Sequence, residues 1–202
     1  MQITYKPIRH GYARIDKDGK LLITIPLSKK GNKQFETILI EKAEKLLKRY
    51  NKRVHIDPVQ KDTILLFGEQ VPIEEFYKQH PHIKQKPAHG NLSPAASKFL
   101  KKILEDYATP IFDLYSKKLG IPYKKLSLRK TSSKRGSCTH DQKLSLNLDL
   151  VHLPTKYIKY VIIHEACHLK VKNHSAKFRA LVESLCPDYK QTKKELRKFV
   201  IR

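Results

Sequence analysis

Two histidines and a glutamate stand close together in His164-Glu165-Ala166-Cys167-His168. If this stretch is helical, the two histidines share one face, because they are four residues apart and a turn takes about 3.6 residues. Both imidazoles could then bind one metal ion, and the carboxylate of Glu165 could reach a water molecule on that ion. This is the His-Glu-x-x-His pattern of zinc hydrolases, so the stretch predicts a Zn²⁺ site with one ion per chain and Glu165 as the general base.

The residues before the first histidine indicate that the helix is buried. Pro154-Thr155 is a typical helix start, and apolar side chains follow at Tyr157, Ile158, Val161, Ile162 and Ile163. Burying ionisable side chains costs free energy. Their presence inside a buried helix therefore favours a functional site. The alternative is a core or solvated helix that carries two histidines by chance.

A catalytic zinc takes three protein ligands and leaves a fourth position for water. The downstream candidates for the third ligand are His174 and Glu183. On a straight helix His174 would lie about 120° round from His168 and roughly 9 Å further along, so it can join the site only if the helix ends soon after Leu169. We expect His174, with Asn173 helping the chain to turn because asparagine tolerates the left-handed conformation. Glu183 falls in a predicted helix over residues 175–185 and would equally suit solvent.

The charge of the chain is unusual for its length. Its 202 residues carry a formal charge of +23, and 40% of them are hydrophobic. Such a surplus favours polyanionic partners such as nucleic acid, nucleotides or acidic surfaces, although a general lysine bias would also produce it. No apolar run approaches the roughly 20 residues of a membrane span. The three cysteines form no CxxC pair, which favours a reducing, cytoplasmic location, and we expect a monomer.

The first half of the chain predicts a β-rich α+β portion over residues 1–80. Asp18-Gly19 favours a hairpin between strands at residues 12–15 and 21–25. An apolar stripe then predicts a helix over residues 32–50. Two further strands are expected at 51–58 and 63–73, the second broken at Gly68. Residues 81–93 are rich in proline, glycine and histidine, which predicts a linker before a metal-hydrolase domain at 94–202.

The second half predicts a small antiparallel or mixed sheet beside the histidine helix. A helix should begin at Ser93-Pro94 and end at Gly120, with Pro110 kinking or splitting it. Alternating leucines predict strands at residues 126–130 and 144–150, with a polar loop between them. The strand at 144–150 is either an edge strand on which an extended peptide could align or a plain interior strand.

Several short motifs in this half resemble the YgjP-like metallopeptidase family. They cover residues 130–199 and are Arg135-Gly136-Ser137-Cys138, Leu146-Asn147, His164 to Leu169, Asn173-His174-Ser175, Phe178 and Pro187-Asp188-Tyr189. The resemblance implies a zincin-like metallopeptidase domain related to SprT-like and WLM proteases. It also implies that the three histidines bind the metal and that Glu165 is catalytic. Arg135 and Arg179 stand where the family usually has tryptophan, and the chain contains no tryptophan.

Three functions are compatible with these residues. The first is a zinc-dependent metallopeptidase, with Arg135, Ser137 and Asn147 as candidate substrate-binding residues. The second is a metal-dependent hydrolase of nucleotides, because basic residues at 129, 130, 134 and 135 lie close in sequence to the site. The third is a nucleic-acid-binding protein with a structural zinc, or a protease recruited to nucleic acid.

Overall fold

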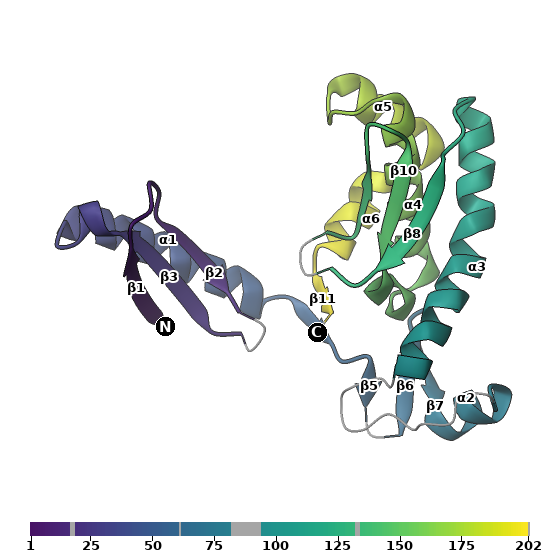
Figure 1. The fold of residues 1–202 in the computed structure, drawn as a ribbon, viewed down its shortest axis with the longest axis horizontal. Helices are drawn as coiled ribbons and strands as arrows, with labels where there is room; N and C mark the ends of the chain where they lie inside the picture. Colours follow the sequence, from purple (N-terminus) through teal and green to yellow (C-terminus); the bar gives the residue numbers. More distant parts are fainter. Residues whose placement is uncertain (17–18, 61, 82–93, 132–133, 202) are drawn as a thin grey trace. The chain divides into compact units, whose positions relative to one another are not determined.

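The computed structural model describes residues 1–16, 19–60, 62–81, 94–131 and 134–201 (Figure 1). Contacts between the described residues form two compact units, Met1–His55 with Lys198–Val200 and Ile56–Arg197 with Ile201. The predicted linker at residues 81–93 lies outside the described residues except for Pro81, so that boundary stays a prediction. The contacts of the described chain divide it after His55.

Unit 1 is a small mixed sheet covered by one helix. The strands are β1 (Gln2–Lys6), β2 (Tyr12–Ile15) and β3 (Leu21–Pro26), in the order β1-β3-β2, with β1 parallel and β2 antiparallel to β3. A short 3-10 helix, η1 (Leu27–Lys29), leads to α1 (Lys33–Asn51), where the side chain of Asn32 accepts a hydrogen bond from the Phe35 N–H at 3.0 Å. The predicted strands at 12–15 and 21–25 and the predicted helix are therefore confirmed.

Short strands occupy the region where two further strands were expected. β4 (Val54–Ile56) pairs with β11 (Phe199–Ile201), and β5 (Val59–Gln60), β6 (Thr63–Leu66) and β7 (Glu69–Pro72) form an antiparallel sheet. The expected break of the strand at Gly68 is confirmed, because residues 63–73 form β6 and β7 on either side of it, and only Ile73 belongs to the next element. Phe67 and Gly68 have positive φ angles of 52° and 87°, which suits the tight turn of a hairpin, and the helix α2 (Ile73–Gln79) follows.

The long helix α3 (Pro94–Leu119) runs along one side of unit 2 (Figure 1). Pro110 lies inside it without splitting it, so the predicted split is wrong. Proline removes one backbone hydrogen bond. The apolar side chains before and after Pro110 are buried on one face, which favours one continuous helix. The fully buried side chains on this face are Ala96, Leu100, Leu104, Ala108 and Phe112.

A second mixed sheet lies beside the histidine helix in unit 2. Its strands are β8 (Lys125–Arg129), β9 (Gly136–Cys138) and β10 (Lys143–Asn147), in the order β8-β10-β9, with β8 parallel and β9 antiparallel to β10. The 3-10 helix η2 (Leu148–His152) and the helices α4 (Thr155–Lys170), α5 (Ala176–Leu185) and α6 (Tyr189–Leu196) follow. The predicted α+β class with small antiparallel and mixed sheets is confirmed.

The predicted strand at residues 144–150 is shorter than expected and central. β10 ends at Asn147, whose side chain accepts a hydrogen bond from the Asp149 N–H at 3.1 Å and so starts the 3-10 helix. Because β10 lies between β8 and β9, its expected role as an edge strand is wrong and the interior alternative is correct. Among the described strands of this sheet, β9 is the edge nearest to the histidine helix.

Candidate metal centre

The helix α4 is held in place by the apolar side chains that its sequence predicts. Tyr157, Ile158, Val161, Ile162 and Ile163 are all buried, and α4 contacts α3, α5, α6 and the sheet. The helix therefore presents its polar residues from a fixed position. His168 is 8% exposed and Glu165 is 7% exposed, while His164 is half-buried.

The chain turns back at the end of α4 and brings a third histidine to the first two. The helix ends at Lys170, and Val171 is extended with φ −129° and ψ 106°. Asn173 does not adopt the left-handed conformation that was expected of it. Its side chain instead accepts a hydrogen bond from the Ser175 N–H at 3.3 Å, and Ser175 caps α5. His174 lies in this turn beside His164 and His168.

The three imidazoles converge through one nitrogen each. Nε2 of His174 lies 3.1 Å from Nε2 of His164 and 3.2 Å from Nε2 of His168. Nitrogens that bind one tetrahedral zinc at about 2.0 Å lie roughly 3.3 Å apart, so these distances fit a shared ion. Among the described residues, His164, His168 and His174 are the cluster of side chains that could bind one metal ion.

The surroundings of His164 and His168 favour the neutral imidazole, which is the form that binds a metal. Nδ1 of His168 lies 3.0 Å from the Val171 carbonyl oxygen, to which a neutral ring donates through Nδ1–H and keeps the Nε2 lone pair free. Burial, together with His168 and His174, lowers the pKa of His164 to about 4. His164 is therefore neutral at neutral pH, which is the form that binds a metal.

Phe178 on α5 packs against the whole cluster. Its ring centroid lies 4.3 Å from that of His168 in a stacked arrangement, and 4.9 Å from those of His164 and His174. At 2% exposure the phenyl ring is itself immobilised by the core. The ring therefore restricts the orientation of all three imidazoles.

The carboxyl of Glu165 on α4 faces strand β9. Gly136 approaches it so closely that a Cβ atom there would lie 2.7 Å from Glu165 Cγ and 2.9 Å from Oε1. Burial raises the pKa of the Glu165 carboxyl to about 7, and Lys134 opposes this shift. A carboxyl with such a pKa can both accept and donate a proton near neutral pH.

A pocket of about 200 Å³ opens beside two of the histidines. Its walls are largely aromatic and apolar, its rim carries two cations, and its lining is Tyr160, His164, His174, Phe178, Arg179, Val182, Tyr189 and Lys193. Neither Arg179 nor Lys193 forms an ion pair with a carboxylate of the described residues. The pocket therefore favours an anionic or aromatic group next to the histidines.

Glu183, the alternative third ligand, does not lie with the histidines. Its carboxylate pairs with Lys190 Nζ at 2.8 Å on the exposed side of α5. The helix α5 carries Phe178 towards the cluster and turns Glu183 away, as expected for residues five apart on a helix. Glu183 is thus outside the histidine cluster.

The three candidate substrate-binding residues are engaged elsewhere. Arg135 Nη2 donates to the Leu196 carbonyl oxygen at 3.0 Å, and Asn147 Nδ2 donates to the carbonyl oxygens of Thr131 and Lys134. Ser137 Oγ lies 2.7 Å from Ser145 Oγ on β10. The structure places all three on or beside β9 and β10 and none of them in the histidine cluster.

Sequence patterns did not identify Gly136 and Phe178 as parts of the site. Both belong to motifs of the family resemblance, but their contacts depend on how β9 and α5 pack on α4. Arg179, one of the arginines at a family tryptophan position, donates through Nη1 to the His174 carbonyl oxygen at 2.8 Å. It therefore helps to hold the turn that carries the third histidine.

Two further features bear on the class of protein. The cysteines Cys138, Cys167 and Cys186 are all free. Among the described residues, none of the helices combines the length and apolarity that a membrane crossing requires.

Two solved structures resemble part of the chain. The metallopeptidase zymogen of Methanocaldococcus jannaschii jannalysin is 21% identical with a TM-score of 0.40, and the match covers 44% of this chain and 92% of that one. The zymogen of Pyrococcus abyssi abylysin is 20% identical with a TM-score of 0.40, and the match covers 44% of this chain and 90% of that one. No curated protein matches the chain.

The sequence model of the YgjP-like metallopeptidase domain matches residues 9–199, which is nearly the whole chain. The histidine cluster, the buried glutamate and the turn after α4 lie within that match. The chain therefore belongs to the YgjP-like metallopeptidase family, and it is a hydrolase of that class.

Proposed function

We propose that this chain is a zinc-dependent metallopeptidase in which His164, His168 and His174 hold one zinc ion and Glu165 is the general base. The observation that carries the proposal is the convergence of three Nε2 atoms within the geometry of a tetrahedral site. The three imidazoles leave room for a fourth ligand. A structural zinc would need a fourth protein ligand, and the cluster among the described residues offers three.

A zinc ion held by His164, His168 and His174 would supply a Lewis acid for a substrate carbonyl and for a bound water. Glu165 takes the proton of the attacking water and passes it to the leaving nitrogen of the substrate. The raised pKa of its carboxyl suits this exchange, since the same group must accept and then donate a proton. Because Gly136 has no side chain, the Glu165 carboxylate has space beside β9. The charge of Lys134 favours the ionised form of Glu165.

The edge strand β9 is the candidate for aligning an extended peptide. It starts at Gly136 against Glu165, and in the described sheet it is paired only with β10. A peptide added to its outer edge would gain backbone hydrogen bonds and would pass the carboxylate. The pocket lined by Tyr160, Phe178 and Tyr189 would receive a neighbouring side chain.

Hydrolysis of a nucleotide phosphoanhydride is the second candidate function. It is favoured by Arg179 and Lys193, the two cations without a carboxylate partner at the pocket beside the histidines. Cations at this position would stabilise the charge of a polyphosphate as it is cleaved.

The proposal includes the setting of the enzyme. Free cysteines support a reducing, cytoplasmic location, and the charge of +23 supports a role for nucleic acid as a partner. The monomeric state remains part of the proposal and is testable by light scattering.

The metal assignment is tested by metal analysis of the purified protein. The wild type should hold one zinc per chain, and His164→Ala should lose it. His140→Ala is the matched control, because His140 is exposed and lies outside the cluster. Full zinc content in His164→Ala would overturn the site.

The substrate assignment is tested with unfolded polypeptide and a panel of nucleoside triphosphates, each with and without a chelator. Cleavage of polypeptide that the chelator abolishes supports the peptidase. Chelator-sensitive hydrolysis of a triphosphate with intact polypeptide supports the second candidate instead.

A further inference from the structure

The sheet β8-β10-β9 has two faces of different chemistry. Side chains alternate along a strand, so every second residue shares a face. Leu126, Leu128, Leu144 and Leu146 lie on the face towards the helices, together with Gly136, whose missing Cβ would meet Glu165 on α4. The register places Ser127, Ser145 and Ser137 side by side on the opposite face, followed by Arg129 beside Asn147.

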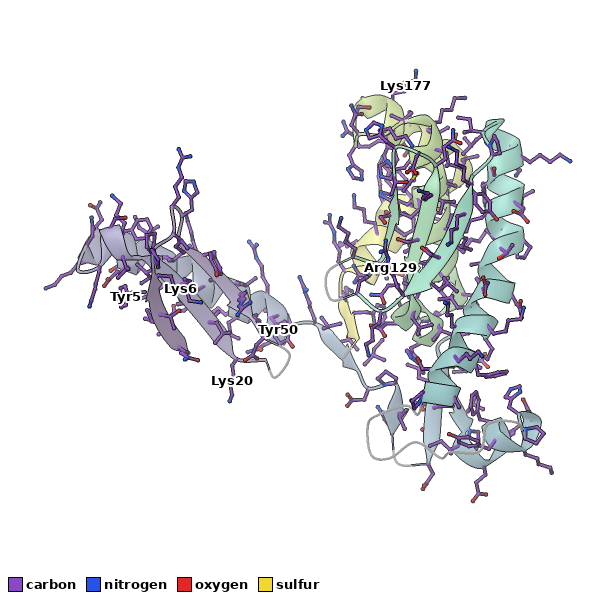
Figure 2. All side chains as sticks on the ribbon, in the orientation of Figure 1. Tyr5, Lys6, Lys20, Tyr50, Arg129 and Lys177 are labelled. Atoms are coloured by element: carbon purple, nitrogen blue, oxygen red, sulfur yellow. The ribbon has the colours of Figure 1, made fainter. Side chains whose placement is uncertain are left out.

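A hollow of about 400 Å³ lies on this polar face, which we call the serine pocket. Its lining is basic and polar and consists of Arg129, Lys130, Thr131, Lys134, Gly136, Ser137, Ser145, Leu146 and Asn147. Figure 2 shows Arg129 towards the end of β8, where the parallel strands β8 and β10 both terminate. It is a different pocket from the one beside the histidines, and the three histidines do not line it.

The two serine hydroxyls leave a hydrogen-bond donor for a ligand. Ser137 Oγ and Ser145 Oγ are 2.7 Å apart, so one hydroxyl donates to the other. Arg129 Nη2 also donates to Ser145 Oγ, at 3.4 Å. Two hydroxyls carry two hydrogens and the pair uses one. Among the described residues no other acceptor takes the second, so it is available to an acceptor in the pocket. Because Ser145 is only 7% exposed, an acceptor on a ligand would satisfy a largely buried hydroxyl.

The charges of the pocket are strongly one-sided. Arg129, Lys130 and Lys134 supply three cations, and Asp149 pairs with Lys130 at 3.7 Å. Burial raises the pKa of the Asp149 carboxyl, so its negative charge is weakened rather than reinforced. No carboxylate of the described residues pairs with Arg129 or Lys134.

We propose that the serine pocket binds a phosphate group. A guanidinium, two ammonium groups and a hydroxyl donor converge on one hollow, and a phosphate offers the acceptor oxygens and charge to match them. The phosphate belongs either to a small phosphorylated molecule or to a nucleic-acid backbone. This site goes beyond the proposed hydrolysis, and its test does not depend on any activity.

The test is calorimetric titration of the full-length, metal-loaded protein with inorganic phosphate. Arg129→Gln should weaken binding by roughly tenfold or more, since it removes a charge-assisted hydrogen bond. Lys125→Gln is the matched control. It removes the same charge from the same face of β8 but lies outside the pocket lining, and it should change affinity less than twofold. Phosphate bound at the histidines would not respond to Arg129.

A second variant tests the hydroxyl donor, and two further probes distinguish the sources. Ser145→Ala should weaken phosphate binding while leaving the charge of the pocket intact. Adenosine monophosphate and a short oligothymidylate are titrated in parallel, and the probe whose affinity Arg129→Gln lowers more identifies the source. Equal effects of Arg129→Gln and Lys125→Gln would overturn the proposal in favour of diffuse charge. Absence of binding by all three probes would overturn it as well.

Discussion

The two units contain sheets of the same pattern with different chemistry against them. In both, a central strand runs parallel to one neighbour and antiparallel to the other, and a helix packs nearby: α1 on β2 and β3, and α4 on β9 and β10. In both, a glycine at the antiparallel edge strand allows the helix to approach. The glycine is Gly11 in unit 1 and Gly136 in unit 2.

The side chain that occupies the space beside the glycine differs between the two units. A Cβ on Gly11 would lie 2.8 Å from Leu39 Cδ2, within an apolar cluster, whereas a Cβ on Gly136 would lie 2.7 Å from Glu165 Cγ. A partly buried leucine that packs on an apolar cluster stabilises the fold, while a buried carboxyl costs free energy unless it is paired. The same scaffold therefore packs an apolar side chain in unit 1 and holds a buried carboxyl, the proposed general base, in unit 2.

The strongest way to break this comparison is to remove the reactive group itself. Glu165→Gln keeps the size of the side chain but removes its basicity, so we expect hydrolysis to fall by about 10²- to 10⁴-fold. The zinc content should be unchanged, since Glu165 lies outside the histidine cluster. Hydrolysis rate and metal content of the same sample check this. Retained hydrolysis would remove Glu165 from the mechanism.

The two glycines can be compared directly. Gly136→Ala should displace the Glu165 carboxylate and lower hydrolysis by about 10²-fold, because small misplacements of a catalytic group have effects of that size. Gly11→Ala should cost about 1–3 kcal/mol of unfolding free energy through overpacking against Leu39, with unchanged hydrolysis. Activity assays and urea unfolding separate the two effects. If Gly11→Ala lowered hydrolysis as much as Gly136→Ala, the distinction between the units would fail.

The aromatic rings beside the two sites extend the comparison. Phe178→Leu removes the ring that packs on all three histidines, so we expect zinc affinity to fall by about tenfold. Phe35→Leu in unit 1 is the control, because Phe35 packs on the apolar cluster formed by β3 and Ala43. Competition with a graded series of chelators measures the affinity. Equal zinc affinities of the two variants would show that the phenyl ring of Phe178 does not orient the ligands.

The smallest expected effect concerns pH. Of the described residues, the buried histidines and carboxylates are His152, Glu165 and His168, all in unit 2. His152 is 2% exposed with Nδ1 2.6 Å from the Leu65 carbonyl oxygen, and burial lowers its pKa.

The sign of the pH effect follows from this lowered pKa. Below the unfolded pKa of about 6.5 the unfolded chain binds a proton that the folded chain does not, so stability falls as pH falls. The slope from one such group is at most about 1.4 kcal/mol per pH unit. Between about pH 7.5 and 5.5, the unfolding free energy of His152→Gln, measured by urea unfolding, should fall less than that of the wild type. Parallel curves would contradict a neutral buried His152.

Much of the site could be predicted because it depends on local spacing. The four-residue separation of His164 and His168 and the apolar run before them define a buried helix with two imidazoles on one face. The third histidine required one further inference, that the helix ends near Leu169, and the helix does end at Lys170. The zinc itself and the role of Glu165 remain predictions.

The errors have a common cause. The alternation of leucines over residues 144–150 continues past the point where Asn147 caps η2, and alternation alone does not reveal whether a strand is central or at an edge. Substrate binding by Arg135 and Asn147 stays a prediction, but the sequence did not reveal the contacts that hold these side chains. Their hydrogen bonds to Leu196 and to the loop before β9 depend on tertiary packing.

The sequence by itself determined the candidate ligand types, the helix that carries two of the three histidines and the family. These follow from residue identity and from periodicities of a few residues, which a chain expresses wherever it folds. Only the tertiary structure decided that Gly136 makes room for Glu165, that β9 is the strand beside it, and that Ser137 and Ser145 line a pocket on the polar face of the sheet. Those features depend on which strand pairs with which and on which helix covers them, and contacts between distant segments determine both.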